Sequence, residues 1–205
     1  MINFLLDLVM HFISISIYII FLSFIYPTFS IVAVDLSNGQ VGSAGASCIG
    51  GSIIISDLHP GVGAIHTQSY WSGYNQIMAS DLMDSGLSPD EIIQHLIEND
   101  VNNNPSIRQY GIVDIYQQGG RSAAYTGENC MDYKNHLLGS NYAIQGNILL
   151  NEQILINIEN NFNSTVGTLS DKLMAALQGA NIFGADSRCL DNETSSLSAF
   201  IRVAE

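Results

Sequence analysis

Thr28 is the residue of this chain whose type and position suggest chemistry. It follows an apolar segment, residues 1–27, and opens a run of β-branched and small residues from Thr28 to Asp35. An N-terminal threonine can act as a nucleophile whose own α-amine takes the proton, because an α-amine titrates near about 7.7–8.0 and is partly neutral at pH 7. Removal of residues 1–27 would therefore unmask a nucleophile, whereas the alternative role of Thr28 is that of an ordinary strand opener.

Residues 1–27 have the composition of an export signal or a membrane anchor. The stretch from Phe12 to Tyr26 carries no charge, the only charge before it is Asp7, and no stop-transfer sequence follows. A stretch of about 20 apolar residues is also long enough to span a bilayer. We therefore expect an exported protein, secreted or in the cell envelope, with membrane anchoring by residues 1–26 as the alternative.

The site of cleavage decides whether Thr28 becomes a terminus. A cut directly before Thr28 places Ile25 and Pro27 where signal peptidase prefers small residues, whereas a cut after Ser23 is easier. The easier cut leaves Phe24 to Pro27 attached, and the Thr28 nitrogen is then an amide without base strength.

Charge and motifs exclude several classes of function. The formal net charge is -13, with 19 acidic and 6 scattered basic residues, so nucleic acid is not an expected partner. The glycines of residues 42–45 lack the lysine and the following helix of a phosphate loop. His59, His66 and Asp57 do not form a helical two-histidine motif, so we expect no metal and no cofactor.

The periodicity of apolar residues predicts strands, then helices, then strands again. A first hairpin, Phe29 to Asp35 with Gln40 to Cys48, turns at Asn38-Gly39, and Asn-Gly favours a tight turn. The remaining expected strands are residues 52–57, 61–69, 107–116, 121–127, 141–146 and 197–204. Helical spacing predicts four helices, at residues 74–82, 92–97, 154–162 and 169–177, and Ser88-Pro89-Asp90-Glu91 forms a capping box before the second.

Several predicted strands are apolar on both faces, which favours a layered α+β fold. Ile31 to Val34 and Ile53 to Ile55 are the clearest examples. Two antiparallel sheets packed on each other between helical layers would bury both faces, so we expect a four-layer α/β/β/α sandwich. A simpler two-layer α+β fold is the alternative. Residues 28–205 are expected to form a single domain.

Six sequence blocks carry a resemblance to a known family. They are Thr28 to Asp35 with Gly42 to Cys48, Gly61 to Gln68, Arg108 to Asp114, Ala123 to Gly127, and Tyr142 to Asn147. In order and spacing they resemble the DUF1028 family, assigned to the N-terminal nucleophile (Ntn) hydrolase superfamily. The resemblance implies the α/β/β/α sandwich and hydrolysis of an amide bond in a small amide or peptide, with Thr28 as the nucleophile.

Residues with supporting roles are expected at the ends of strands. The Asn147 side chain and the Gly146 backbone are candidate oxyanion donors, or else form a structural turn. His66 and Gln68 would orient the substrate or satisfy loop backbone. Asp186 and Arg188 could form a charge pair that anchors a substrate carboxylate or amide, although the family commonly has Gly-Asp-Arg-Arg-Gly here and this chain has Gly184-Ala185-Asp186-Ser187-Arg188.

Three cysteines suggest one disulfide and one buried thiol in an exported protein. We expect Cys130 to pair with Cys189, because both lie in polar, loop-like sequence. Cys48 ends an apolar strand and is expected to be a small buried apolar residue.

Two hypotheses from different classes therefore remain open. The first is an exported Ntn-type amidohydrolase of undefined substrate. The second is a secreted, non-catalytic binding or structural module that keeps the same fold, since fold does not fix function.

Overall fold

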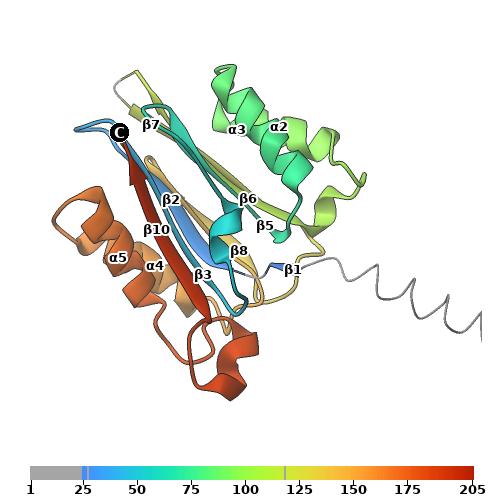
Figure 1. The fold of residues 1–205 in the computed structure, drawn as a ribbon, viewed down its shortest axis with the longest axis vertical. Coiled ribbons are helices and arrows are strands. Elements are labelled where there is room, and N and C mark those ends of the chain that lie inside the picture. Colours follow the sequence, from blue (N-terminus) through green and yellow to red (C-terminus); the bar gives the residue numbers. More distant parts are fainter. Residues whose placement is uncertain (1–24, 27, 118) are drawn as a thin grey trace, which may run out of the picture.

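The computed structural model describes residues 25–205 except residues 27 and 118 (Figure 1). The predicted leader therefore lies outside the described residues, apart from Ile25 and Tyr26. No helix in the described part of the chain is long and apolar enough to cross a membrane.

One antiparallel sheet, here called sheet A, contains five strands. In spatial order it has β1 (Ile25–Tyr26), β5 (Gly63–Tyr70), β6 (Arg108–Tyr116) and β7 (Gly119–Thr126), and β4 (Ser56–His59) also pairs with β5. Because β6 occupies one edge of β5, β4 and β1 share the other edge. β4 pairs with residues 63–66 and β1 with Ser69 and Tyr70.

The second antiparallel sheet, sheet B, also contains five strands. Their spatial order is β10 (Ser198–Ala204), β3 (Gln40–Ser47), β2 (Phe29–Asp35), β9 (Tyr142–Gly146) and β8 (Asn135–Gly139). The strand that follows Thr28 is thus the central strand, with β3 on one side and β9 on the other.

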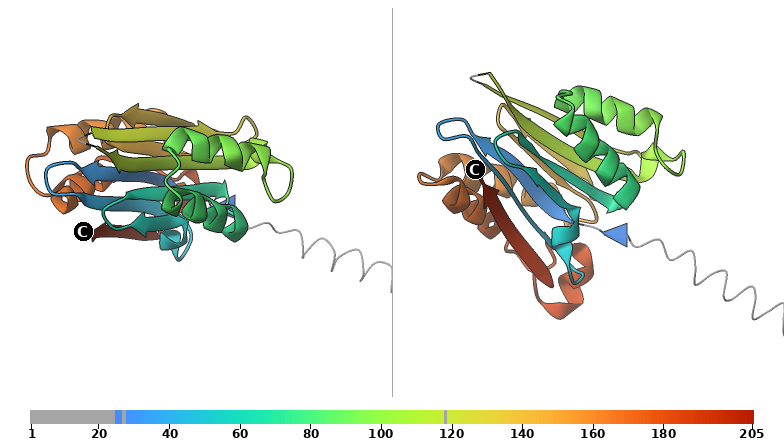
Figure 2. Two further views of the ribbon diagram at one scale, coloured as in Figure 1. Left: turned by 90° about the horizontal axis from the view of Figure 1, so that it is seen from above. Right: turned by 45° about the horizontal axis from the view of Figure 1, so that its top comes forward.

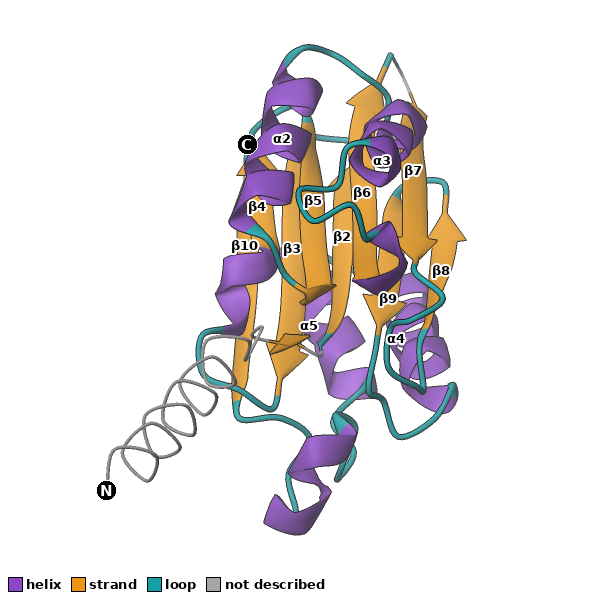
Figure 3. Ribbon diagram, turned by 90° about the vertical axis from the view of Figure 1, so that its right-hand side faces the viewer, coloured by secondary structure: helices purple, strands orange, loops and turns teal. Residues whose placement is uncertain are grey.

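Two pairs of helices cover the sheets, as Figures 1, 2 and 3 show from different sides. Helices α2 (Gly73–Asp84) and α3 (Pro89–Glu98) pack on sheet A, where Met83, Ile92 and Leu96 meet Ile65 and Ile112. Helices α4 (Gln153–Ser164) and α5 (Leu169–Gly179) pack on sheet B through a second apolar cluster. A smaller cluster joins the sheets themselves, where Val32, Val34, Val41 and Ala143 of sheet B meet Ala64 and Val113 of sheet A.

Three of the predictions are confirmed. The fold is α+β with two antiparallel sheets, and the first hairpin turns at Gly39, whose φ of 76° favours glycine. Ser88 and Glu91 form the predicted capping box at the start of α3.

The predicted strand at residues 52–57 is wrong in its first half. Residues Ser52–Ile55 form a 3-10 helix, η1, and only Ser56–His59 extend as β4. Ile53 and Ile54 are 49% and 36% exposed, so this apolar run is not buried on both faces. A short apolar run cannot by itself distinguish a strand from a helical turn, and the left-handed Gly51 before it starts the turn. Strand β8 was not among the strands expected from the sequence.

The predicted disulfide is wrong as well. Cys48 is bonded to Cys189, with a Cα–Cα distance of 5.6 Å, and Cys130 is a free, buried thiol. The fold explains the pairing, because β10 lies beside β3 and the 3-10 helix η3 (Ser187–Asn192) therefore reaches the end of β3. Cys130 instead donates from Sγ to the carbonyl oxygen of Arg108 at 3.2 Å. The remaining 3-10 helix, η2 (Pro105–Ile107), precedes β6.

Candidate functional site

Thr28 lies directly before the central strand of sheet B and is completely buried. Its carbonyl oxygen accepts a hydrogen bond from Gln68 Nε2 at 3.1 Å and another from the backbone N–H of Asn147 at 3.2 Å. These contacts come from different sheets, since Gln68 is on β5 and Asn147 follows β9. The backbone of Thr28 is therefore held between the two sheets.

Gln109 on β6 is the centre of a buried amide network around Thr28. Its Oε1 accepts from Gln68 Nε2 at 2.8 Å and from Asn147 Nδ2 at 3.0 Å. Its Nε2 donates to the carbonyl oxygen of Gly146 at 2.9 Å. Gln68, Gln109 and Asn147 are each at most 1% exposed. The network thus ties Gly146, the last residue of β9, and Asn147, which follows it, to Gln68, which holds Thr28.

The network continues inward between the sheets through Ser30. Ser30 Oγ donates to Gln68 Oε1 at 2.6 Å and accepts from Gln145 Nε2 at 2.6 Å. Gln145 Nε2 also lies 3.2 Å from His66 Nδ1. Gly111 on β6 leaves the space for this amide, because a Cβ there would lie 1.8 Å from Gln145 Oε1. The side chain of Gln145 from sheet B can therefore occupy this space only because residue 111 of sheet A is a glycine.

His66 is an uncharged imidazole in this interior. Complete burial, with a smaller effect from the positive charge of Arg202, lowers the pKa of His66 to about 3. The ring also meets Phe200 edge to face, with centroids 5.8 Å apart. His66 shares a face of β5 with Ala64 and Gln68.

Several buried polar atoms of the network have no hydrogen-bond partner among the described residues. They are His66 Nε2, Gln145 Oε1 and Asn147 Oδ1. An unpaired buried polar group costs about 1–3 kcal/mol, so groups of them in a native structure call for an explanation beyond stability. Their location marks the interior beside Thr28 as the candidate site.

The predicted pair of Asp186 and Arg188 forms at the same end of sheet B. Arg188 Nη2 lies 2.8 Å from Asp186 Oδ2, which also accepts from the backbone N–H of Cys48 at 2.7 Å. Arg188 Nη2 further donates to Ser47 Oγ at 3.4 Å. Phe29 pairs with Ala46, so Ser47 ends β3 level with Thr28. Asp186 is completely buried, whereas one third of the Arg188 side chain is exposed.

The predicted oxyanion donors are already used within the protein. The Asn147 amide donates to Gln109, its backbone N–H donates to Thr28, and Gly146 is paired with Phe29 and with Asn135 in sheet B. The structure thus brings Thr28, Gln68, Gly146 and Asn147 together. It places His66 further inside and the Asp186–Arg188 pair beside the neighbouring strand.

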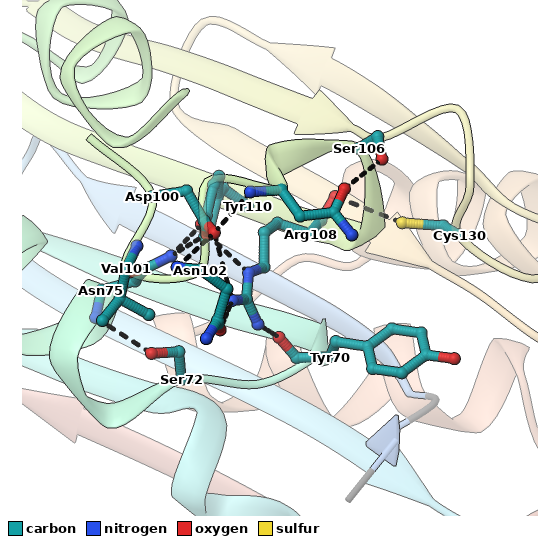
Figure 4. A network of polar contacts seen from close by, with 11 residues as sticks. Tyr70, Ser72, Asn75, Asp100, Val101, Asn102, Ser106, Arg108, Tyr110 and Cys130 are labelled. Atoms are coloured by element: carbon teal, nitrogen blue, oxygen red, sulfur yellow. Dashed lines mark hydrogen bonds and ion pairs between the residues drawn. The ribbon is translucent and has the colours of Figure 1, made fainter. Parts of the chain in front are cut away.

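A second buried network fixes the end of β5 (Figure 4). Asp100 accepts from Arg108 Nε at 2.7 Å and from Asn75 Nδ2 at 2.6 Å, and Arg108 also donates to the carbonyl oxygen of Tyr70. Burial raises the pKa of Asp100, but Arg108 and the N–H groups of Asn104, Asn75 and Asn102 outweigh burial and lower this pKa to about 2. Both charges are 4% exposed or less, so this ion pair is an internal brace.

An apolar groove of about 410 Å³ lies away from Thr28, between α5 and β10. Phe29 and Ala46 line it from the face of sheet B that carries α5, whereas Ser30 faces the other sheet. The described residues contain no group of three or more His, Cys, Asp or Glu side chains placed to hold a metal ion.

Fold and site together define an α+β protein with two antiparallel sheets and a buried polar site at the start of a central strand. The chain belongs to DUF1028, a family of unknown function, whose model matches residues 28–205. The crystal structure of protein SPO2555 from Silicibacter pomeroyi, assigned to the same family, is similar with a TM-score of 0.73 and 23% sequence identity. This similarity covers 87% of the present chain and 76% of the other, and it concerns the fold alone. No curated protein matches the chain.

Sequence reasoning missed Gln109, Ser30 and Gln145 as members of the site. Gln109 lies in one of the blocks that resemble the family, but nothing in its local sequence distinguishes it from a surface glutamine. The available signal is positional: a glutamine at an inward position of an apolar strand needs buried partners.

Proposed function

We propose that this chain is an exported amide hydrolase of the N-terminal nucleophile type, with Thr28 as the nucleophile once residues 1–27 are removed. The proposal includes the four-layer α/β/β/α arrangement of that superfamily. The observation that carries it is the convergence of buried amides from both sheets on Thr28, whose carbonyl is held by Gln68 and Asn147. Buried polar atoms without partners are costly, and natural proteins keep them mainly at functional sites.

In the proposed reaction, Thr28 Oγ attacks the carbonyl carbon of an amide while the α-amine of Thr28 takes the hydroxyl proton. The carbon–nitrogen bond breaks as that proton passes to the leaving amine, and the acyl group remains as an ester on Oγ. Water then hydrolyses the ester. The amine suits this role because its ordinary pKa is about 7.7–8.0. In the full chain the same nitrogen is an amide to Pro27 and has no base strength.

The surroundings of Thr28 support roles for the other candidate residues. Asn147 Nδ2 is a side-chain donor of the network, and in the proposed reaction it would leave Gln109 Oε1 and stabilise the oxyanion. Asn147 Oδ1, which is buried and has no hydrogen-bond partner among the described residues, would accept from the α-amine of Thr28 or from a leaving amine. The part-exposed Arg188, held by Asp186, would bind a carboxylate or amide oxygen of the substrate.

The disulfide supports the proposed location. Disulfides persist in oxidising compartments and are rare in reducing ones. The Cys48–Cys189 bond joins η3 to the end of β3, beside the Asp186–Arg188 pair. Export by the apolar leader would place the protein in such a compartment.

The test compares two proteins that differ by a single residue. One begins at Thr28, and the matched control begins at Pro27, so that the Thr28 amine is blocked. Each is treated with a β-lactone, which acylates activated hydroxyls, and the adduct is mapped by mass spectrometry. We expect one acyl group on Thr28 in the first protein and none in the control. Thr28→Ser should keep the reaction and Thr28→Ala should abolish it.

Two outcomes would contradict the proposal. Labelling of Thr28→Ala, or equal labelling of the protein that begins at Pro27, would assign the reactivity to another nucleophile. Absence of labelling in the protein that begins at Thr28 would favour the non-catalytic module.

A further inference from the structure

The residues before Thr28 complete sheet A in the uncleaved chain. Ile25 pairs with Tyr70 and Tyr26 with Ser69, antiparallel to β5. On this edge of β5 the other strand, β4, reaches only as far as His66. Among the described strands, β1 is therefore the one that covers the edge beyond Gln68.

The same short stretch of β5 holds the chain on both sides of residue 27. Ser69 pairs with Tyr26, and the neighbouring Gln68 donates to the carbonyl oxygen of Thr28. Ile25, Tyr26 and Thr28 thus all contact the stretch of β5 from Gln68 to Tyr70. The nitrogen and Oγ of a threonine are attached to neighbouring carbon atoms. An acyl chain bonded to Thr28 Oγ therefore begins close to the place where residue 27 is bonded to the Thr28 nitrogen in the uncleaved chain.

We infer that the edge of β5 at Ser69 and Tyr70 is the docking strand for the acyl side of a peptide substrate, which binds as an added antiparallel strand in place of β1. This inference rests on the proposed function and narrows its substrate class. The substrate is an extended peptide with at least two residues before the residue whose carbonyl is attacked, rather than a small amide. Ile25 and Tyr26 cover this edge until the leader is removed.

The docking edge is rigid before any substrate arrives. Arg108 pairs with Ser69 in the sheet, donates to the carbonyl oxygen of Tyr70, and is fixed by its ion pair with Asp100 (Figure 4). The backbone N–H of Trp71 donates to the carbonyl oxygen of Ser69 at 3.1 Å, which closes the turn after the strand. A preformed strand edge recognises the main chain of a peptide, with side-chain pockets adding only selectivity.

Among the residues whose burial is described, every member of the three apolar clusters lies at Phe29 or later, so a chain without β1 keeps all of these core residues. A chain that begins at residue 28 can therefore be used for a binding test, with Thr28→Ala to prevent turnover.

The test measures fluorescence anisotropy of a labelled peptide with the sequence of residues 24–27, Phe-Ile-Tyr-Pro. We expect the peptide to bind the Thr28→Ala chain that begins at residue 28, and to bind the full chain with Thr28→Ala at least about tenfold more weakly, because the attached β1 competes at high effective concentration. Successive residues of a strand point their N–H groups to opposite sides, so only one of the Ile and Tyr N–H groups of the bound peptide faces β5. N-methylation of that residue should weaken peptide binding about tenfold or more, whereas N-methylation of its neighbour should leave binding unchanged.

The results separate this inference from the proposed function. Absence of binding, equal binding to both chains, or equal binding of all the N-methylated peptides would overturn the docking strand, even if the β-lactone labels Thr28. Specific binding without labelling of Thr28 would retain the docking strand and reject the hydrolase.

Discussion

Gly111→Ala tests the contact between the two sheets at the candidate site. Gly111 pairs with His66 on one side and with Ala124 on the other, and its missing side chain leaves room for the Gln145 amide from sheet B. A Cβ at this position would lie 1.8 Å from Gln145 Oε1 and 2.4 Å from its Cδ. Such distances require the amide to move out of the interior.

The expected cost follows from the contacts that the Gln145 amide would lose. Gln145 Nε2 donates to Ser30 Oγ at 2.6 Å and lies 3.2 Å from His66 Nδ1, and both partners are completely buried. A buried group left without its partner costs about 1–3 kcal/mol, and Ser30 keeps its bond to Gln68, so we expect a loss of about 3 kcal/mol in the free energy of unfolding. For a domain of this size that corresponds to a fall in Tm of about 6–12 °C.

Urea denaturation of a double-mutant cycle isolates this clash. Gly50→Ala is the matched control, because a Cβ there would meet nothing within 4 Å, and it should change stability by less than about 0.5 kcal/mol. Gln145→Ala empties the space beside residue 111, so in this background Gly111→Ala should lower the free energy of unfolding only slightly. An equal cost of Gly111→Ala in both backgrounds would refute the described contact.

Three further predictions concern the bonds that brace the fold. Thiol titration of the unfolded protein should find one free thiol without reductant and three with reductant, and three thiols without reductant would contradict the disulfide. Cys189→Ala should lower the free energy of unfolding by about 2–5 kcal/mol. Asp100→Asn should cost about 3–5 kcal/mol at neutral pH, because it leaves Arg108 buried without its partner. Because the pKa of Asp100 is lowered, its contribution to the free energy of unfolding is present above its ordinary pKa of 3.8 and is lost as pH falls toward about 2. Urea titrations at several pH values should therefore show that the cost of Asp100→Asn shrinks in that range. The carboxylate of Asp57, 3.6 Å from His59 Nε2, and that of Asp84, 2.6 Å from Nδ1, raise the pKa of His59 above 6.5. The stabilisation from these pairs is therefore present below pH 6.5 and is lost as pH rises through the folded-state pKa. His59→Gln should remove this slope from the plot of Tm against pH, and an unchanged slope would contradict the contacts.

The sequence was sufficient where a structure depends on neighbouring residues. The Asn38-Gly39 hairpin and the Ser88–Glu91 capping box each require only a few adjacent residues, and both are present. Because these signals are local, the order of strands and helices could be predicted almost completely.

The sequence was insufficient where the partner is distant along the chain. Cys48 and Cys189 are 141 residues apart, and only the pairing of β10 with β3 brings them together. The role of Gln109 likewise depends on the packing of sheet A against the end of β9, which no local pattern encodes. The pairing of residues 25 and 26 with β5 was hidden within a segment that reads as a leader.

The N-terminal sequence of the mature protein, purified from its native host, tests the central claim most directly. The proposed mechanism requires the free amine of Thr28, so the mature chain should begin at Thr28. A mature chain that begins at Phe24 or earlier would leave the Thr28 nitrogen as an amide and would contradict the mechanism.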